Sequence, residues 1–214
     1  MQKGLAAGLA IIAAGFASPA LSHPHIFAEA RVEIVSGDDG SFKELRHVWR
    51  FDDVFSASVL MDYDKNSDLK LDPAELKEIA DTIRESLADY SYFTFVTKDG
   101  ADAAIAKPDV FNVDYRENQL LIFFVAKPKA PLTIGGKMTF GVYDPTLYTA
   151  IDFANDSDLV VEGASFAACS HKVVRPDPDQ ILAQNQANLT EAFFNDPAGN
   201  DMGKLFATRM EITC

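Results

Sequence analysis

The sequence predicts a single α+β domain, in which a mainly antiparallel β-sheet or sandwich carries a helix–loop–helix inserted after the second strand. Three observations lead to this prediction. Residues 26–34 alternate between apolar and polar side chains, the period of a half-buried strand. Residues 73–90 repeat their apolar side chains with helical spacing. Most of the chain after residue 90 is rich in aromatic and β-branched residues separated by turn signals.

Two strands joined by a tight turn are expected first. The turn at residues 37–40 reads Gly-Asp-Asp-Gly and separates the strand at 26–34 from a second strand at about 45–51. One face of the second strand consists of Leu45, His47, Trp49 and Phe51. Because both strands carry an apolar face, the pattern favours a β-hairpin.

Two helices are expected next. Asp52 and Asp53 suit the N-terminal cap of a short helix that reaches about residue 60. A polar stretch at 62–72 leads to Pro73, which opens the clearest helix of the chain. The apolar stripe of this helix is Leu76, Ile79, Ala80, Ile83, Leu87 and Tyr90.

The remaining chain is mostly β-structure in this prediction. Strands are expected at 92–97, 110–115, 120–125, 138–143, 147–153 and 159–161. The run at 120–125 is continuously apolar, which predicts a central strand buried on both faces. Residues 179–194 have weaker helical character.

Residues 1–22 have the features of a secretory signal peptide. A basic start is followed by an apolar segment at 4–17, and Ala20 and Ser22 are small residues that suit a cleavage site. Cleavage after Ser22 predicts export to the bacterial periplasm and leaves residues 23–214 as one domain. No internal run reaches the roughly 18–20 apolar residues that a membrane span requires, so no span is expected in the mature protein.

The charge balance narrows the classes of partner. The chain has 19 basic and 32 acidic residues, a formal net charge of −13. Such a chain repels nucleic acid phosphates, so no nucleic acid partner is expected. The sequence also lacks a nucleophile elbow, a phosphate loop, a dinucleotide fingerprint and a His-Glu-x-x-His motif, and no enzymatic activity is predicted.

Cysteine usage points to one disulfide. The chain has two cysteines, Cys169 and Cys214, which are natural partners in an oxidising compartment. Loop-closure entropy gives such a disulfide a stabilisation of about 4 kcal/mol. The alternative is two free buried thiols.

The predicted mature N-terminus, His23-Pro24-His25, has metal-binding chemistry. His23 would offer its α-amine and its imidazole to one metal ion, and His25 would add a second imidazole. Pro24 has no amide N–H, so it does not support a square-planar amide chelate. This imidazole-rich set suits zinc first, and copper or nickel next. The alternative is a frayed terminus with two solvated histidines.

A second candidate cation site is the loop between the two predicted helices. Positions 1, 3, 5, 7 and 12 of a calcium loop are matched by Asp64, Asn66, Asp68, Lys70 and Glu75. Leu69 stands at position 6, where the sharp turn favours glycine. The alternative needs no ion, because Asp72 and Glu75 also match a helix capping box. Bound calcium and an empty, calcium-like loop are both open interpretations.

Three single residues are further candidate metal ligands. His47 lies on an apolar strand face, where a lone histidine is more often a hydrogen-bonded core residue than a ligand. Asp144 either starts a turn in Tyr143-Asp-Pro-Thr146 or offers a carboxylate to a metal ion. His171 follows Cys169 closely, so a disulfide would hold it nearby.

The order of these features resembles a bacterial family of unknown function, described as the periplasmic component of an uncharacterised ABC-type transport system. The resemblance rests on Ser22-His-Pro-His25-Ile-Phe27, His47-x-Trp49-x-Phe51-Asp52, Phe55-Ser56, the loop from Asp64 to Glu75, Val142-Tyr143-Asp-Pro145 and the terminal cysteine. Similar proteins are often encoded beside nickel/cobalt-type or zinc-related membrane transporters. They often carry glycine in the calcium-type loop, a pattern from which Leu69 departs.

The resemblance implies a periplasmic metal-binding accessory or receptor protein that serves an inner-membrane transition-metal transporter. It favours Asp144 and His47 as ligands beside His23 and His25. The alternative function is a non-catalytic periplasmic interaction or structural module, with or without calcium in its loop.

Overall fold

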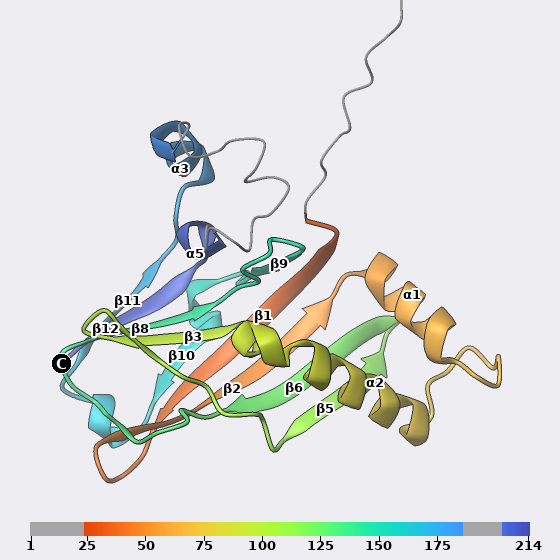
Figure 1. Cartoon of the computed structure of the whole chain (residues 1–214), viewed down its shortest axis with the longest axis horizontal. Helices are drawn as coiled ribbons and strands as arrows, with labels where there is room; N and C mark the ends of the chain where they lie inside the picture. Colours follow the sequence, from red (N-terminus) through yellow and green to blue (C-terminus); the bar gives the residue numbers. More distant parts are fainter. Residues whose placement is uncertain (1–23, 186–202) are drawn as a thin grey trace, which may run out of the picture.

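Two β-sheets and a pair of helices surround one hydrophobic core in the computed structural model, which describes residues 24–185 and 203–214. Within these residues the first sheet has seven strands: β1 (Ile26–Ser36), β2 (Ser41–Phe51), β5 (Phe111–Arg116), β6 (Gln119–Ala126), β7 (Leu132–Thr133), β9 (Thr149–Asp152) and β10 (Leu159–Glu162). The second sheet has five: β3 (Thr94–Lys98), β4 (Ala101–Ala103), β8 (Lys137–Val142), β11 (Ser170–Val174) and β12 (Arg209–Thr213). The predicted α+β domain with mainly antiparallel sheets is confirmed (Figure 1).

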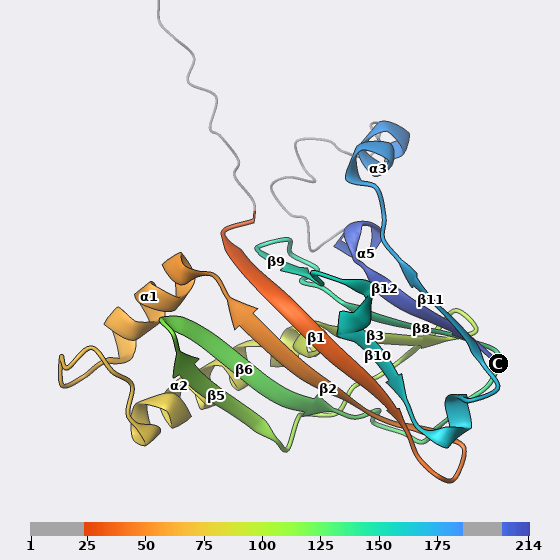
Figure 2. The same cartoon turned by 180° about the vertical axis from the view of Figure 1, so that it is seen from behind.

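The predicted hairpin of β1 and β2 forms the centre of the first sheet. This sheet runs in the order β10-β1-β2-β6-β5, with β7 paired to β2 and β9 paired to β1. Val32 lies opposite His47 and Ala30 opposite Trp49, so the buried faces of the two strands coincide. Seen from behind, β1 lies between β2 on one side and β9 and β10 on the other (Figure 2).

Two parallel pairings on β1 were not expected from the sequence. Ile26 lies opposite Thr149 of β9, and Val32 lies opposite Leu159 of β10. Such pairings join residues more than a hundred positions apart, so no local pattern indicates them. The pairing with β9 brings the loop at 143–149 beside the start of β1, and this arrangement positions the site described below.

Helices α1 (Asp53–Tyr63) and α2 (Pro73–Ser86) confirm the predicted insertion after the second strand. The Asp52 carboxylate caps α1 by accepting hydrogen bonds from the backbone N–H groups of Val54 and Phe55, both at 2.9 Å. Asp72 and Glu75 form the predicted capping box of α2. Helix α1 lies at one end of the first sheet, and α2 runs across β5 and β6 (Figure 1). Val59 of α1 and Ile79 and Ala80 of α2 are buried in the core.

The end of the second helix differs from the prediction. Helix α2 stops at Ser86, and a 3-10 segment, η1 (Ala88–Phe93), follows it. Tyr90 therefore lies beyond the helix, where its side chain is 40% exposed. Tyr92 and Phe93 have positive φ angles of 55° and 51°, so strand β3 begins two residues later than the predicted position 92. The prediction missed this break because aromatic residues are ordinarily typical of extended backbone.

Strand β6 was predicted to be buried on both faces, and this prediction is wrong. Its residues alternate between buried and half-buried positions. The half-buried side chains of Leu121 and Val125 lie opposite Arg50 and Arg46 of β2. The outer face of the first sheet thus carries charged residues at this point and faces solvent, so only one face of β6 enters the core.

The C-terminal part of the described chain contributes to the second sheet. Its other elements are η2 (Asp156–Asp158), η3 (Ala164–Phe166), α3 (Pro178–Asn185) and α5 (Gly203–Phe206). Helix α3 covers the start of the helix predicted at 179–194, whose remainder lies outside the described residues, as do the signal peptide at 1–22 and His23. Cys169 and Cys214 form the predicted disulfide. No helix among the described residues is long and apolar enough to cross a membrane.

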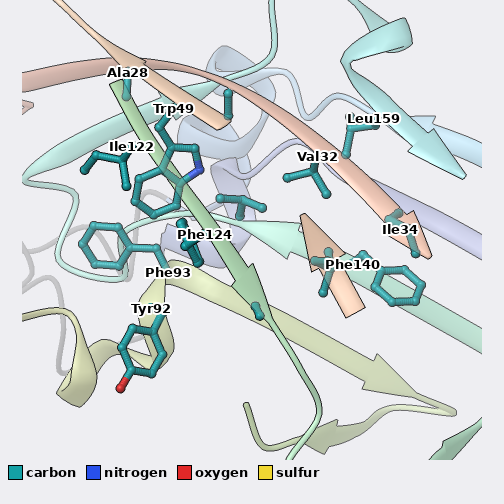
Figure 3. Packing of buried hydrophobic residues seen from close by; sticks show 14 of the residues in the cluster. Ala28, Val32, Ile34, Trp49, Tyr92, Phe93, Ile122, Phe124, Phe140 and Leu159 are labelled. Carbon is teal, nitrogen blue, oxygen red and sulfur yellow. The ribbon is translucent and has the colours of Figure 1, made fainter. Parts of the chain in front are cut away.

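Side chains from both sheets meet in the core. Figure 3 shows Trp49 of β2 packed beside Ile122 and Phe124 of β6, with Phe93 close to the indole ring. The rings of Phe42 and Phe140, one from each sheet, lie 5.1 Å apart between centroids. Large aromatic side chains therefore account for much of the buried apolar area that stabilises the domain.

Candidate functional site

A cavity of about 420 Å³ opens between the first sheet, the two helices and the loop at 143–149. Its volume is in the range of small-molecule sites. The described side chains that line it are mostly apolar: Ile26, Trp49, Phe51, Phe55, Ile83, Leu87, Tyr90, Phe93, Ile122 and Tyr148. The polar members are Ser86, Asp144, Thr146 and Thr149. Among these residues Asp144 is the one acidic group, and no lysine, arginine or histidine is present.

Five of the lining rings form a continuous aromatic wall: Tyr90, Phe93, Trp49, Phe51 and Phe55. Successive ring centroids along this wall are 6.1, 6.1, 6.5 and 5.1 Å apart. Figure 3 shows Phe93 and Ile122 beside the six-membered ring of Trp49. The wall combines residues of β2, α1 and η1, so it exists only in the folded domain.

Asp144 brings a charge to this apolar cavity. Its side chain is 3% exposed. One carboxylate oxygen, Oδ1, accepts hydrogen bonds from the backbone N–H and the hydroxyl of Thr146, at 2.7 and 2.6 Å. The other, Oδ2, accepts one from the N–H of Thr149 at 2.9 Å. An ionised carboxylate has about four acceptor positions, so one remains on Oδ2.

The backbone of this region explains how Asp144 is held. The predicted turn is present, since the N–H of Leu147 donates to the carbonyl of Asp144 at 3.1 Å. Leu147 has a positive φ of 58°, an unusual conformation for a leucine. Gly203 lies so close to the carbonyl of Asp144 that an added Cβ would be 2.8 Å from that oxygen. The C-terminal region therefore supports the loop from its other side.

His25 lies beside this loop. Its backbone N–H donates to the carbonyl of Tyr148 at 2.9 Å, and the rings of the two residues are 4.9 Å apart. The next residue, Ile26, lies opposite Thr149 in the parallel pairing of β1 and β9. The structure therefore brings two sequence candidates, His25 and Asp144, to the same edge of the domain. The third, His23, lies outside the described residues.

His47 lies in the core and does not line this cavity. Its side chain is 2% exposed and stacks on Phe124 with 4.2 Å between ring centroids. Nε2 lies 3.3 Å from the hydroxyl of Thr94. Desolvation lowers the pKa of His47 from 6.5 to about 3, so the ring is neutral at physiological pH.

The hydrogen bonds define the tautomer of the neutral His47 ring. The Thr94 hydroxyl donates to the carbonyl of Tyr92 at 3.0 Å, so it accepts from the protonated Nε2 of His47. Nδ1 then carries a lone pair, and it has no hydrogen-bond partner in the described structure. His47 thus fulfils the expectation for a hydrogen-bonded core histidine. His171, by contrast, is exposed on β11 opposite Ile212 in the second sheet.

The acidic loop, residues 64–75, is closed by hydrogen bonds from its own backbone to its carboxylates. Oδ2 of Asp64 accepts a hydrogen bond from the N–H of Leu69 at 2.7 Å, and Oδ1 accepts one from the N–H of Asp68 at 3.2 Å. Leu69 adopts the glycine-like turn conformation with φ of 61°. Glu75 is 5% exposed, and its two oxygens accept from the N–H groups of Lys65 and Asp72, at 2.8 and 2.9 Å.

The other predicted loop ligands make contacts of the same local kind. Oδ1 of Asn66 accepts from the N–H of Asp68 at 2.9 Å, and Oδ1 of Asp68 accepts from the N–H of Lys70 at 2.9 Å. Across the described ranges, no group of three or more His, Cys, Asp and Glu side chains is arranged to hold a metal ion. Asp64, Asp68 and Glu75 accept hydrogen bonds from N–H groups of the acidic loop itself.

A family profile described as "Protein of unknown function (DUF1007)" matches residues 8–214. The chain belongs to the DUF1007 family. No curated protein matches it. Membership in DUF1007 supports the expected resemblance to an uncharacterised family and assigns no activity to the site.

A larger cavity of about 870 Å³ in this DUF1007 protein lies between the second sheet and α3. Its basic side chains include Lys137, Arg175 and Arg209. Lys137 and Arg209 pair with Glu211, and Arg175 pairs with Asp156 and Asp152. These three charges have carboxylate partners, whereas Lys204, the fourth basic side chain of the described lining, is in no ion pair among the described residues. This cavity therefore mixes basic groups with the carboxylates of Asp99 and Asp177, while the cavity beside Asp144 has one carboxylate and no basic side chain in its described lining.

Sequence reasoning missed the residues that form the aromatic wall. Phe55 belongs to α1 and Tyr90 and Phe93 belong to η1, and each was interpreted as part of a helix or strand pattern. Their aromatic character was visible, but the cavity depends on how α1 and η1 pack on β2. A local signal for this packing is absent from the sequence.

Proposed function

We propose that this DUF1007 protein is a periplasmic metal-binding accessory or receptor protein of an inner-membrane transition-metal transport system. The bound ion would lie between the N-terminal histidines and the Asp144 loop. The observation that carries the proposal is the attachment of His25 to Tyr148, through a backbone hydrogen bond of 2.9 Å and a ring contact. This attachment holds His25 beside the loop that contains Asp144.

Each proposed ligand has a separate contribution. Cleavage after Ser22 would give His23 a free α-amine and make its amine and imidazole a chelating pair. His25 adds an imidazole, and Asp144 has one remaining acceptor position on Oδ2. Two imidazoles, an amine and a carboxylate suit zinc first, and copper or nickel next. His47 is not included, because its ring is packed in the core.

Metal titration of protein with the authentic N-terminus tests this proposal. Intact mass should show that protein exported by its native host begins at His23. Competition titration with zinc should then show one site, and His25→Ala should weaken it about tenfold or more, since a ligand is lost. One residue added before His23 should have a similar effect, because it moves the amine out of the chelate.

Two matched variants separate this site from other parts of the domain. His171→Ala removes an exposed histidine from the second sheet and should leave zinc affinity unchanged. Glu75→Gln changes the acidic loop and should also leave it unchanged. Equal zinc affinity of wild type, His25→Ala and the extended form would contradict a metal site at the N-terminus.

One observation favours a second candidate function, a calcium-stabilised interaction module. The acidic loop already has the turn that a calcium loop needs, although leucine stands in the place of glycine. Calcium binding to this loop, measured by isothermal titration of wild type and Leu69→Gly, would support the module.

A further inference from the structure

We propose that the cavity beside Asp144 binds an organic ammonium ion with an apolar body. This ligand is distinct from the metal ion proposed above. Within the described lining of the cavity, Asp144 is the one carboxylate, and no basic side chain accompanies it. A buried negative charge of this kind favours a cation and disfavours a carboxylic acid or a phosphate.

The aromatic wall selects an organic cation. Ring faces attract ammonium groups and exclude water from an apolar body at the same time. The wall runs from Tyr90 through Phe93, Trp49 and Phe51 to Phe55 with short steps between the rings. The cavity volume of about 420 Å³ has room for a small amine with an aromatic or aliphatic body.

The hydrogen bonds of Asp144 define the contact with the ammonium group. Oδ1 already accepts two bonds and Oδ2 accepts one, so Oδ2 has room for one N–H donor. A protonated primary or secondary amine supplies such a donor with the matching charge. The same acceptor position is used in the proposed metal site, so the amine and the metal ion would bind one at a time.

A matched set of three probes tests the charge preference. Phenethylammonium, 2-phenylethanol and 3-phenylpropanoate share a phenyl body and differ in the charge of the end group. Trp49 is the single tryptophan of the chain and lines the cavity, so its fluorescence reports occupancy. With EDTA present to remove metal ions, phenethylammonium should bind about tenfold more tightly than 2-phenylethanol, and 3-phenylpropanoate should not bind. Equal binding of the amine and the alcohol, or no binding of the amine, would overturn the proposal.

Variants of the cavity complete the test. Asp144→Asn should weaken phenethylammonium binding about tenfold and leave 2-phenylethanol binding unchanged. Asp114→Asn, which changes a carboxylate that does not line the cavity, is the control and should bind the amine as wild type does. Equal amine affinity of these two variants would contradict the role of Asp144.

The aromatic wall provides a variant that does not depend on the Asp144 loop. Tyr90 lies at the rim and is 40% exposed, so Tyr90→Leu should fold normally, as circular dichroism can verify. It should weaken phenethylammonium binding about threefold while 2-phenylethanol binding changes less. An unchanged amine affinity in Tyr90→Leu and in Phe55→Leu would overturn the cation–π part of the proposal. Because these titrations contain no metal ion, their failure leaves the zinc experiment unaffected, and the converse also holds.

Discussion

The acidic loop and the Asp144 loop, residues 143–149, have similar local hydrogen bonds but lie in different surroundings. In each, a carboxylate accepts N–H bonds from residues a few positions later, and each contains a leucine with positive φ. The acidic loop lies at the tip of the helix pair, where its central residues are exposed (Figure 1). The carboxylate of Asp144 is instead buried beside an aromatic cavity.

This difference shows that loop conformation alone does not make a binding site. The acidic loop has the spacing and turn of a calcium site, yet its carboxylates are satisfied by its own backbone. The Asp144 loop has no recognised ligand spacing, but long-range pairing places it beside His25 and the aromatic wall. Three predictions separate the two regions, and one, on His47, concerns the core that adjoins the aromatic wall; the expected effects decrease from the first to the last.

Removal of the disulfide should have the largest effect and should act on one region. The double variant Cys169→Ser, Cys214→Ser should lose about 4 kcal/mol of unfolding free energy, because a long loop is no longer closed. That loop includes Gly203, which packs against the carbonyl of Asp144. Urea denaturation measures the loss, and hydrogen exchange should become faster at 143–149 than at 64–75. Equal acceleration in both regions would show that they are not independent.

The second prediction compares one carboxylate from each region. Asp144→Ala should lower the unfolding free energy by about 3 kcal/mol, because it leaves the N–H groups of Thr146 and Thr149, which are partly buried, without their hydrogen-bond partner. Asp68→Ala should cost less than about 1 kcal/mol, since water can replace the lost bonds of an exposed residue. Urea denaturation of both variants at pH 7 gives the two values. Equal losses of unfolding free energy in the two variants would contradict the role of burial at Asp144.

The third prediction concerns pH and the core that adjoins the aromatic wall. The pKa of His47 is about 3 in the folded protein, whereas an exposed histidine has a pKa of 6.5. As the pH falls, His47 therefore takes up a proton in the unfolded chain before it does so in the folded protein. His47 therefore contributes stability above pH 6.5 that is lost as the pH falls towards 3. The loss should be about 1.4 kcal/mol per pH unit, or about 2 kcal/mol at pH 5.

A pair of variants isolates this contribution. His47→Phe keeps an aromatic ring on Phe124 and should lose the His47 part of the pH dependence between pH 7 and 5. His171→Ala removes an exposed histidine and should retain it. Urea denaturation at several pH values measures both slopes. The same pH dependence in His47→Phe and wild type would show that His47 is not the buried base.

The features that the sequence predicted correctly are those with local causes. The hairpin of β1 and β2, the Asp52 cap and the capping box at Asp72 each depend on residues close in the chain. The disulfide was predictable because two cysteines allow one pairing within the chain. The parallel pairing of Ile26 with Thr149 was not, since hydrophobic alternation indicates a strand but not its neighbours.

The same limit applies to the site. His25 and Asp144 were each recognised from their chemistry, but the pairing of β1 with β9 makes them neighbours. His47 was predicted both as a core residue and as a metal ligand. Its stacking on Phe124 agrees with the first interpretation, which rested on the apolar face of its strand. The burial of only one face of β6 also depends on residues distant in the sequence, because its other face lies beside the charged residues of β2.

The smallest effect is expected from the two leucines with positive φ. Leu69→Gly should raise the unfolding free energy by about 1 kcal/mol, because glycine adopts this conformation without strain and the Leu69 side chain is 75% exposed. Leu147→Gly should gain less or lose stability, because its side chain is half-buried and its removal costs apolar contacts.

Calcium titration of Leu69→Gly also tests the acidic loop. This variant should bind calcium more tightly than wild type, and Glu75→Gln should abolish that gain. If neither wild type nor Leu69→Gly binds calcium in isothermal titration, the acidic residues serve only to cap α2 and close the turn.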